Sequence, residues 1–375
     1  MRHSGTIHRW LTVALASTLA IIVACGADAQ PSPPPTAVPS ETATAPMGTP
    51  TTTTSAEPVV TATAAGVSVR PQGTRYGIAG LVPPHFPESS DADWLAFFAA
   101  LPGLGGTVGN YSQLGDLAEN QEVGLAAGLD VLPVTGFHRD VDGGLEVAFD
   151  FSDPAQRDAF TRGLLAFVAE YRPDYLGVGN EVNRVWEESP EAFTAWVDAL
   201  PELVAAVHQV SPGTRVFATF QYEFLLGRDL ITGEQRAEDW SPLEQAAPYL
   251  DLVAFTSYPY FAAEDPAALP ADYYAAIVEH TDRPVGFTEL GWPSAPILPL
   301  VGSSLEGLGG TPEEQAEFIR RLGALVAPLS PEFMMWVWAY DTPAVGPTFE
   351  SLGLSAADGT SKPAAEAWQT LAGIE

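Results

Sequence analysis

The alternation of short apolar runs with longer amphipathic segments is the feature that most constrains the fold. Eight runs of β-forming composition recur at an average spacing of about 37 residues. They are Tyr76 to Val82, Thr107 to Tyr111, Val131 to Phe137, Tyr175 to Gly179, Val216 to Phe220, Leu252 to Tyr258, Val285 to Thr288 and Phe333 to Tyr340. A strand followed by a helix or loop, repeated eight times, predicts an α/β fold: a single (β/α)8 TIM barrel.

Start signals support the helices between these runs. Asp153 and Ser189 each stand directly before a proline, which is favoured at the first position of a helix. Thr311 followed by Glu314 matches a capping box. A doubly wound open sheet is the alternative fold. It would require a glycine-rich phosphate turn after the first strand, and residues 76–83 lack the third glycine and the acidic partner of that turn.

The N-terminal 70 residues have a different composition. Residues 1–24 combine two arginines with an apolar segment that is too short for a comfortable membrane span, as in a signal peptide. The segment ends at Cys25, the one cysteine of the chain, and resembles a bacterial lipoprotein signal, which implies that Cys25 is lipidated. Ordinary cleavage after Ala29 and an uncleaved anchor are the alternatives. Residues 25–70 are rich in Pro, Thr, Ser and Ala and predict a disordered tether, which leaves 71–375 for the barrel.

Charge restricts the partners. The chain has 47 acidic and 16 basic side chains and a formal charge of −31, which argues against nucleic acid as a ligand and against anionic polymers as substrates. Lys362 is the single lysine and lies near the C-terminus, so chemistry that needs a lysine nucleophile is disfavoured. Six histidines include no His-x-His pair. We therefore expect neither a metal nor a cofactor.

Two glutamates stand where strands meet the mouth of the predicted barrel. Glu181 follows the fourth apolar run and Glu289 ends the seventh. Active sites of TIM barrels lie at the C-terminal ends of the strands. Two carboxyl groups across a cleft suit glycoside hydrolysis, in which one is protonated and assists the leaving oxygen while the other is ionised.

These residues carry a resemblance to glycoside hydrolase clan A, the TIM-barrel retaining glycosidases. Asn180-Glu181 is similar to the Asn-Glu pair that follows the fourth strand in that clan, and Glu289 to the glutamate that ends the seventh. The segments 178–182 and 289–294 look most like family 17, the β-1,3-glucanases, and less like family 53, the endo-β-1,4-galactanases. Family 17 continues its eighth strand into an Asp-Glu pair, whereas this chain has Tyr340-Asp341-Thr342, so the substrate stays open.

The resemblance implies a role for each matching residue. Glu289 would be the nucleophile of a double displacement, and Glu181 would be the acid and then the base. The Glu289 carboxylate is expected to favour the protonated state of Glu181. Asn180 would bond the 2-hydroxyl of the sugar, and Tyr258 would hold the nucleophile. Because strict alternation sends Asn180 and Glu181 to opposite faces, the fourth strand must end there.

Aromatic and polar side chains near other strand ends extend the predicted substrate site. Trp338 is the expected platform under the sugar ring, with Trp336 either in the core or at the site. Further candidates for substrate binding are Trp292, His138, Asn110 and Gln221. The segment between Gly227 and Ser241 is either a wall of the cleft or a solvated loop.

Three functional hypotheses follow. The first is an extracytoplasmic, cell-surface lipoprotein that hydrolyses O-glycosyl bonds of a polysaccharide, β-1,3-glucan or β-galactan, as a membrane-anchored monomer. The second is a surface lipoprotein that binds carbohydrate without turnover. The third is a sugar-binding lipoprotein of a transporter, which would fold as two doubly wound lobes.

Overall fold

The computed structural model describes residues 71, 73–141, 144–229, 235–297, 308 and 310–374. The predicted signal peptide, Cys25 and the tether lie outside these residues. The barrel begins at Arg75, close to the predicted boundary at residue 71.

Eight parallel strands close into one barrel, which confirms the predicted fold class. They are β1 (Arg75–Ile78), β2 (Thr107–Tyr111), β3 (Asp130–Val134), β6 (Tyr175–Gly177), β7 (Arg215–Gln221), β8 (Leu252–Ser257), β9 (Val285–Leu290) and β10 (Phe333–Trp336). Their order around the barrel is β1-β10-β9-β8-β7-β6-β3-β2, so strands that are consecutive in the ring are also consecutive in the chain. A closed barrel is incompatible with two doubly wound lobes, and the transporter hypothesis is therefore wrong.

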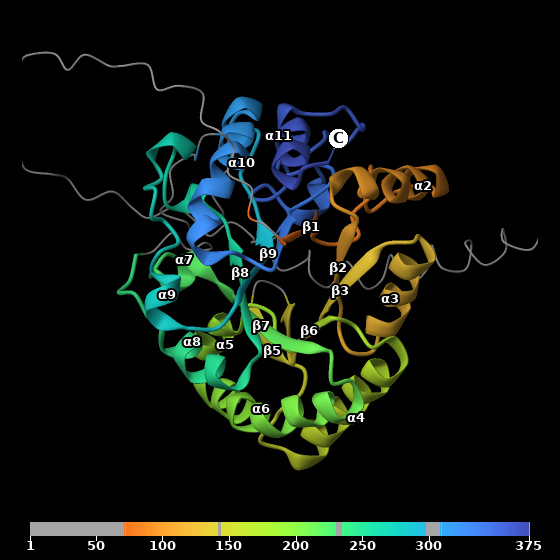
Figure 1. The fold of residues 1–375 in the computed structure, drawn as a ribbon, viewed down its shortest axis with the longest axis vertical. Helices are drawn as coiled ribbons and strands as arrows, with labels where there is room; N and C mark the ends of the chain where they lie inside the picture. The colour runs from red at the N-terminus through yellow and green to blue at the C-terminus, as the bar shows by residue number, and fades with distance from the viewer. Residues whose placement is uncertain are drawn as a thin grey trace, which may run out of the picture. The chain divides into compact units, whose positions relative to one another are not determined.

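Helices surround the strands, as Figure 1 shows. They are α2 (Asp91–Ala100), α3 (Leu117–Ala126), α4 (Pro154–Tyr171), α5 (Val182–Glu188), α6 (Pro190–Val210), α7 (Tyr222–Leu225), α8 (Ser241–Ala246), α9 (Ile277–His280), α10 (Pro312–Val326) and α11 (Pro363–Ala372). Short 3₁₀ segments are Leu101–Leu104, Ala247–Tyr249, Pro259–Phe261, Pro266–Ala268, Ala327–Leu329 and Pro343–Val345. None of the described helices combines the length and apolar character needed to cross a bilayer.

Two of the predicted helix starts are capped by the expected side chain. Asp153 accepts a hydrogen bond from the backbone N–H of Ala155 at 2.8 Å and begins α4. Thr311 accepts from the N–H of Glu314 at 3.1 Å and begins α10. Ser189 precedes α6, but its side chain makes no capping bond. These side chains satisfy N–H groups that the first helical turn leaves without a partner.

The structure contains a two-stranded antiparallel hairpin after β3 that the sequence did not predict. Its strands are β4 (His138–Val141) and β5 (Gly144–Val147). The sequence predicted that the third barrel strand ends at Phe137, but it ends at Val134. The N–H of Thr135 donates a last hydrogen bond to the carbonyl of Gly177 in β6 at 2.9 Å. His138 therefore belongs to the hairpin, because the chain leaves the barrel ladder before it.

Aromatic rings fill the end of the barrel at which the strands begin. The ring of Phe333 lies 5.4 Å from that of Phe217 and 5.2 Å from that of Tyr175, centroid to centroid. Gly286 faces the Phe333 ring so closely that an added Cβ would lie 2.3 Å from it. Dense packing at this end makes a rigid base, while the opposite end carries the polar residues described next.

Candidate active site

Glu289 lies near the end of β9, and its side chain is only 8% exposed. Tyr258, the first residue after β8, donates a hydrogen bond from its phenol to Oε2 of Glu289. Both side chains are buried at the C-terminal ends of neighbouring strands. The structure therefore brings together the two residues that the sequence predicted to be nucleophile and holder.

Glu181 follows β6, which ends four residues earlier at Gly177. The early end agrees with the prediction that the strand terminates before the Asn-Glu pair. The backbone of Glu181 has φ 45° and ψ 46°, in the left-handed region that residues other than glycine rarely adopt. Backbone conformations of this kind concentrate at functional sites, where the surroundings hold them in place.

Two threonines fix the Asn180-Glu181 pair. Thr256 of β8 donates from Oγ1 to Oε1 of Glu181 at 2.6 Å. Thr219 of β7 accepts from the N–H of Glu181 at 2.6 Å and donates to Oδ1 of Asn180 at 2.8 Å. Arg184 lies 3.4 Å from Oε2 of Glu181. Strand β8 thus orients the carboxyl group of Glu181 and strand β7 holds its backbone, and both strands lie between β6 and β9 in the barrel.

Burial and charge shift the ionisation of the predicted nucleophile. Burial, followed by the negative charge of Glu181, raises the pKa of Glu289 to about 8, while the hydrogen bond from Tyr258 opposes the rise. Glu289 is the more deeply buried of the two glutamates. The expected protonation of Glu181 stays a prediction.

Burial and the charges of Glu181 and Glu289 raise the pKa of two tyrosines at the mouth of the barrel. Burial and then the charges of Glu289 and Glu181 raise the pKa of Tyr258. Burial and then the same two charges raise the pKa of Tyr111 at the end of β2. Its hydroxyl donates a hydrogen bond to the carbonyl of Thr288 at 2.5 Å, which also favours the neutral phenol. Both phenols are therefore neutral at physiological pH and can donate hydrogen bonds. Their shared response places Glu181 and Glu289 in one electrostatic environment.

Trp338, the predicted sugar platform, lies just beyond β10 and is 8% exposed. Its ring is so close to Gly80, two residues beyond β1, that a Cβ on that glycine would lie 3.0 Å from it. Within the described ranges its indole N–H has no hydrogen-bond partner. Trp336 is fully buried and donates instead to the carbonyl of Leu352 at 2.9 Å, so it belongs to the core.

Three predicted substrate contacts, Asn110, Gln221 and Trp292, have side chains that are turned into the protein. Asn110 donates to the carbonyl of Leu117 at 2.9 Å and accepts from Ser112 at 2.5 Å. The amide of Gln221 caps α7 through Phe224 at 2.5 Å and donates to Glu223 at 2.7 Å. Trp292 is fully buried between the rings of Tyr260 and Phe318. This burial speaks against direct substrate contact, which these residues' sequence positions had suggested.

His138 is buried at the start of the hairpin, 5.3 Å from the ring of Phe137. Its carbonyl accepts a hydrogen bond from the side chain of Gln113 at 3.3 Å. A contact between His138 and substrate remains a prediction.

Sequence reasoning missed three polar residues of this region: Thr219, Thr256 and Glu223. Thr256 could have been found, because it has the same parity as Tyr258 and alternate residues of a strand face the same side. Glu223 gives no such signal, since it lies in a helix that begins directly after β7.

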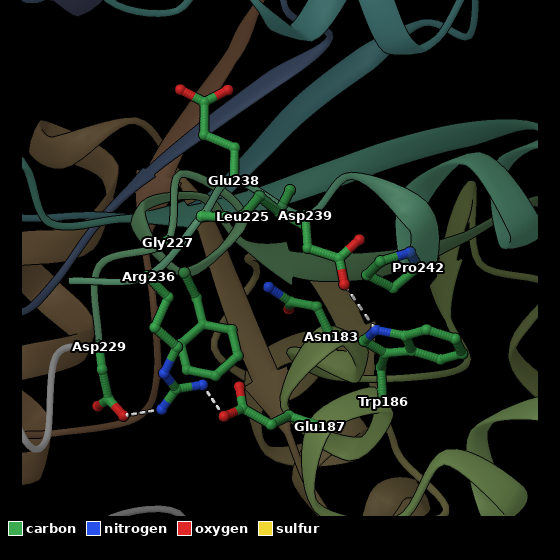
Figure 2. A pocket seen from close by; sticks show the side chains of 12 residues that line it. Asn183, Trp186, Glu187, Leu225, Gly227, Asp229, Arg236, Glu238, Asp239 and Pro242 are labelled. Atoms are coloured by element: carbon green, nitrogen blue, oxygen red, sulfur yellow. Dashed lines mark hydrogen bonds and ion pairs between the residues drawn. The ribbon is translucent and has the colours of Figure 1, made fainter. Parts of the chain in front are cut away.

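A cavity of about 460 Å³ lies beside α5, outside the group just described (Figure 2). The residues that line it are Asn183, Trp186, Glu187, Phe224, Leu225, Gly227, Asp229, Arg236, Ala237, Glu238, Asp239 and Pro242. Arg236 forms ion pairs with Glu187 and, at 2.6 Å, with Asp229. The described part of the segment after Gly227 is therefore fixed as a wall of this cavity, whose lining includes neither Glu181 nor Glu289.

Comparison with known proteins agrees with the barrel. No family model and no curated protein sequence matches the chain. A family 17 β-1,3-glucanosyltransferase from Rhizomucor miehei superposes with a TM-score of 0.52 at 18% identity, over 78% of this chain and 97% of that one. A family 39 glycoside hydrolase from Bacteroides cellulosilyticus gives 0.54 at 16% identity, over 81% and 64%. An exo-β-1,4-mannosidase from Opitutaceae bacterium strain TAV5 gives 0.54 at 16%, over 80% and 59%.

The chain has the barrel fold of the clan A glycoside hydrolases. The predicted resemblance in fold is thereby confirmed. At these identities the likeness speaks to the fold alone, so the chemistry must be argued from the residues at the mouth.

Proposed function

We propose that this chain is a retaining β-glycoside hydrolase in which Glu289 is the nucleophile and Glu181 is the acid/base. The hydrogen bond from Tyr258 to Glu289 carries the proposal, because it orients a buried carboxylate beside a second one at the mouth of a TIM barrel. One carboxyl that attacks and one that moves a proton are the two groups that the reaction requires.

The reaction would proceed in two displacements. In the first, an oxygen of Glu289 bonds to the anomeric carbon while the glycosidic bond breaks and the leaving oxygen takes a proton from Glu181. In the second, Glu181 removes a proton from water, the water oxygen bonds to the anomeric carbon, and the ester to Glu289 breaks. The raised pKa of Glu289 means that the empty site holds a proton at neutral pH. Before the first displacement this proton passes to Glu181, which leaves Glu289 ionised to attack and Glu181 protonated to assist the leaving oxygen.

The fixed neighbours serve this cycle. Thr256 holds Oε1 of Glu181, and we assign Oε2, which Arg184 approaches to 3.4 Å, to the leaving group. Thr219 fixes the side chain of Asn180, which we assign to the 2-hydroxyl of the sugar. Trp338 is 8% exposed at the mouth, and we assign the exposed part of its ring to contact with the sugar.

A neutral polysaccharide is the proposed substrate, with β-1,3-glucan first and β-galactan second. The strongly acidic chain would repel an anionic polymer. The preference for glucan is supported by the similarity to the family 17 β-1,3-glucanosyltransferase, an active-site mutant of which is described in complex with laminaritriose.

Glycosyl transfer is a second candidate, because the similar family 17 structure is a transferase. It shares the first displacement and differs only in the acceptor, which is a sugar hydroxyl instead of water. A carbohydrate-binding protein without turnover is the third. An oriented nucleophile, Glu289, argues against it.

The location proposed is the outer face of the membrane, with a lipid on Cys25. The support is the apolar segment that ends at the only cysteine of the chain. Cys25→Ser should shift the protein from the membrane fraction to the medium, and unchanged membrane retention would refute the lipid anchor.

Product analysis of laminarin, galactan, xylan and mannan digests tests the reaction. Wild-type protein should release reducing ends from one of these, with the anomeric configuration of the first product retained by NMR. Glu289→Ala should abolish release, whereas Glu317→Gln, an exposed carboxylate of α10 paired with Arg320, should not. Added azide should restore turnover to Glu289→Ala with inverted configuration.

Products longer than the substrate would establish transfer. Equal rates for wild type and Glu289→Ala would remove the nucleophile assignment. Binding without release from any glycan would favour the non-catalytic alternative.

A further inference from the structure

Glu223 is a third carboxylate at this end of the barrel. It lies in the first turn of α7, directly after β7, and its side chain is completely buried. Burial of an ionisable group is unfavourable unless hydrogen bonds compensate. Its surroundings therefore show what the side chain is for.

Four donors converge on the Glu223 carboxylate. Oε1 accepts from Ser257 Oγ at 2.6 Å and from the Tyr273 hydroxyl at 3.1 Å. Oε2 accepts from the backbone N–H of Tyr258 at 2.9 Å and from Gln221 Nε2 at 2.7 Å. A carboxylate has about four acceptor positions, and all are used. The site is therefore built for a group that only accepts, although burial raises the pKa of Glu223 against the effect of these donors.

Two of the four donors belong to the end of β8. Ser257 is the last residue of that strand and Tyr258 is the next. Glu223 binds the side chain of the first and the backbone of the second, so it fixes the point from which the Tyr258 ring projects. That ring reaches Glu289. Two hydrogen bonds, on opposite ends of one tyrosine, connect Glu223 to the proposed nucleophile.

We propose that Glu223 is a positioning residue that holds Tyr258 in place to orient the carboxylate of Glu289. The inference rests on the proposed function for its catalytic meaning. Glu223 itself would touch no substrate, since all of its acceptor positions are occupied within the protein. Its effect would pass through the Tyr258 phenol, which stabilises the ionised form of Glu289.

The direction of one pKa change separates positioning from simple electrostatics. Removal of a nearby negative charge would lower the pKa of Glu289, because like charges disfavour ionisation. Displacement of the Tyr258 phenol would raise it, because the ionised carboxylate would lose a donor. The two effects have opposite signs and can be read in the protein without substrate.

The test is a carbon-13 NMR titration of Glu289 in the full chain, with the signal assigned by its loss in Glu289→Gln. Tyr258→Phe should raise the pKa of Glu289, and Glu223→Leu should raise it by about half a pH unit or more. In the double variant Glu223→Leu should add no further rise, because Tyr258→Phe has already removed the phenol donor. Glu332→Leu is the matched control, a carboxylate that binds Arg215 and Tyr175 at the other end of the barrel.

Glu223→Gln tests the proposal if Glu223→Leu does not fold. Its amide oxygen can still accept from Tyr258 while its NH2 faces the hydroxyls of Ser257 and Tyr273, so a smaller rise is expected. An unchanged or lowered pKa of Glu289 in both variants would overturn the proposal, as would a shift of equal size in Glu332→Leu. A raised pKa in a chain that cleaves no glycan would leave Glu223 as the positioning residue and remove the glycosidase function instead.

Discussion

Tyr258 donates its phenolic hydrogen to Glu289, and both side chains are buried at the ends of adjacent strands. The bond stabilises an ionised carboxylate in a place where burial and the charge of Glu181 oppose ionisation. Glu289 is therefore expected to reduce the stability of the fold at the pH at which it is ionised. Such a conflict between stability and function is common at active sites.

The first prediction concerns the pH dependence of folding. The pKa of Glu289 rises from 4.5 to about 8 on folding, so its contribution to stability is fully present below about 4.5 and is lost as the pH rises to about 8. Glu289→Gln cannot ionise and lacks this loss. At pH 8.5 the variant should be more stable than wild type by several kcal/mol, because each pKa unit is worth about 1.4 kcal/mol. Urea unfolding at pH 5 and pH 8.5 measures this; an equal difference at both values would contradict it.

The second prediction concerns the coupling of the two glutamates. After burial, the charge of Glu181 is the largest cause of the raised pKa of Glu289. Glu181→Gln should therefore lower that pKa, as measured by the same NMR titration. Thr256→Val is the control, since it removes the hydrogen bond to Glu181 and keeps the charge. If the two variants titrate alike, the charge of Glu181 is not the cause.

The sequence was sufficient to predict the barrel and to place Glu181 and Glu289 at its mouth. Strand periodicity and the rule that parallel strands end at one edge are local and topological, so they do not depend on side-chain packing. Asn110 and Gln221 show the limit. Position at a strand end does not determine the direction of a side chain, and both amides turn inward to satisfy buried backbone groups.

Glu223 is a residue whose role the sequence could not have indicated. Its role depends on Ser257, Tyr258 and Tyr273, which come from 34 to 50 residues further along the chain. No spacing in the sequence marks that convergence. The hairpin that carries His138 was also missed, because the apolar run of the third strand continues past the point where the ladder ends.

The third prediction concerns Asp341, where the chain departs from the family 17 pattern. Asp341 forms an ion pair at 2.5 Å with Lys362, the only lysine, whose side chain is 10% exposed. Lys362→Met would leave a half-buried carboxylate without its cation and should cost about 3 kcal/mol of unfolding free energy. Adding Asp341→Asn should recover most of that cost. Urea unfolding of the single and double variants decides; an additive result would exclude the pairing as the cause.

The fourth prediction concerns the base of the barrel. Glu332 accepts from Tyr175 at 2.8 Å and pairs with Arg215. Glu332→Gln should lower the unfolding free energy by about 1–2 kcal/mol, because the group is partly exposed and solvent screens the pair. The pH profile of kcat/KM should not change, since the network lies at the strand ends opposite Glu289. A shifted profile would mean that the base of the barrel is coupled to the mouth.

The last prediction separates binding from stability at Trp338. The residue is 8% exposed at the mouth, while its indole N–H is buried and has no partner in the described chain. In our proposal the exposed part of the ring contacts the sugar.

Trp338→Phe removes part of that surface. The variant should lose about ten-fold in kcat/KM, the equivalent of about 1.4 kcal/mol, and some unfolding free energy, because the smaller ring leaves a cavity. Trp292→Phe is the matched control: it leaves a similar cavity, but its ring is fully buried between Tyr260 and Phe318 and cannot reach substrate. Equal losses of kcat/KM in the two variants would mean that Trp338 acts through core packing and not through contact with the sugar.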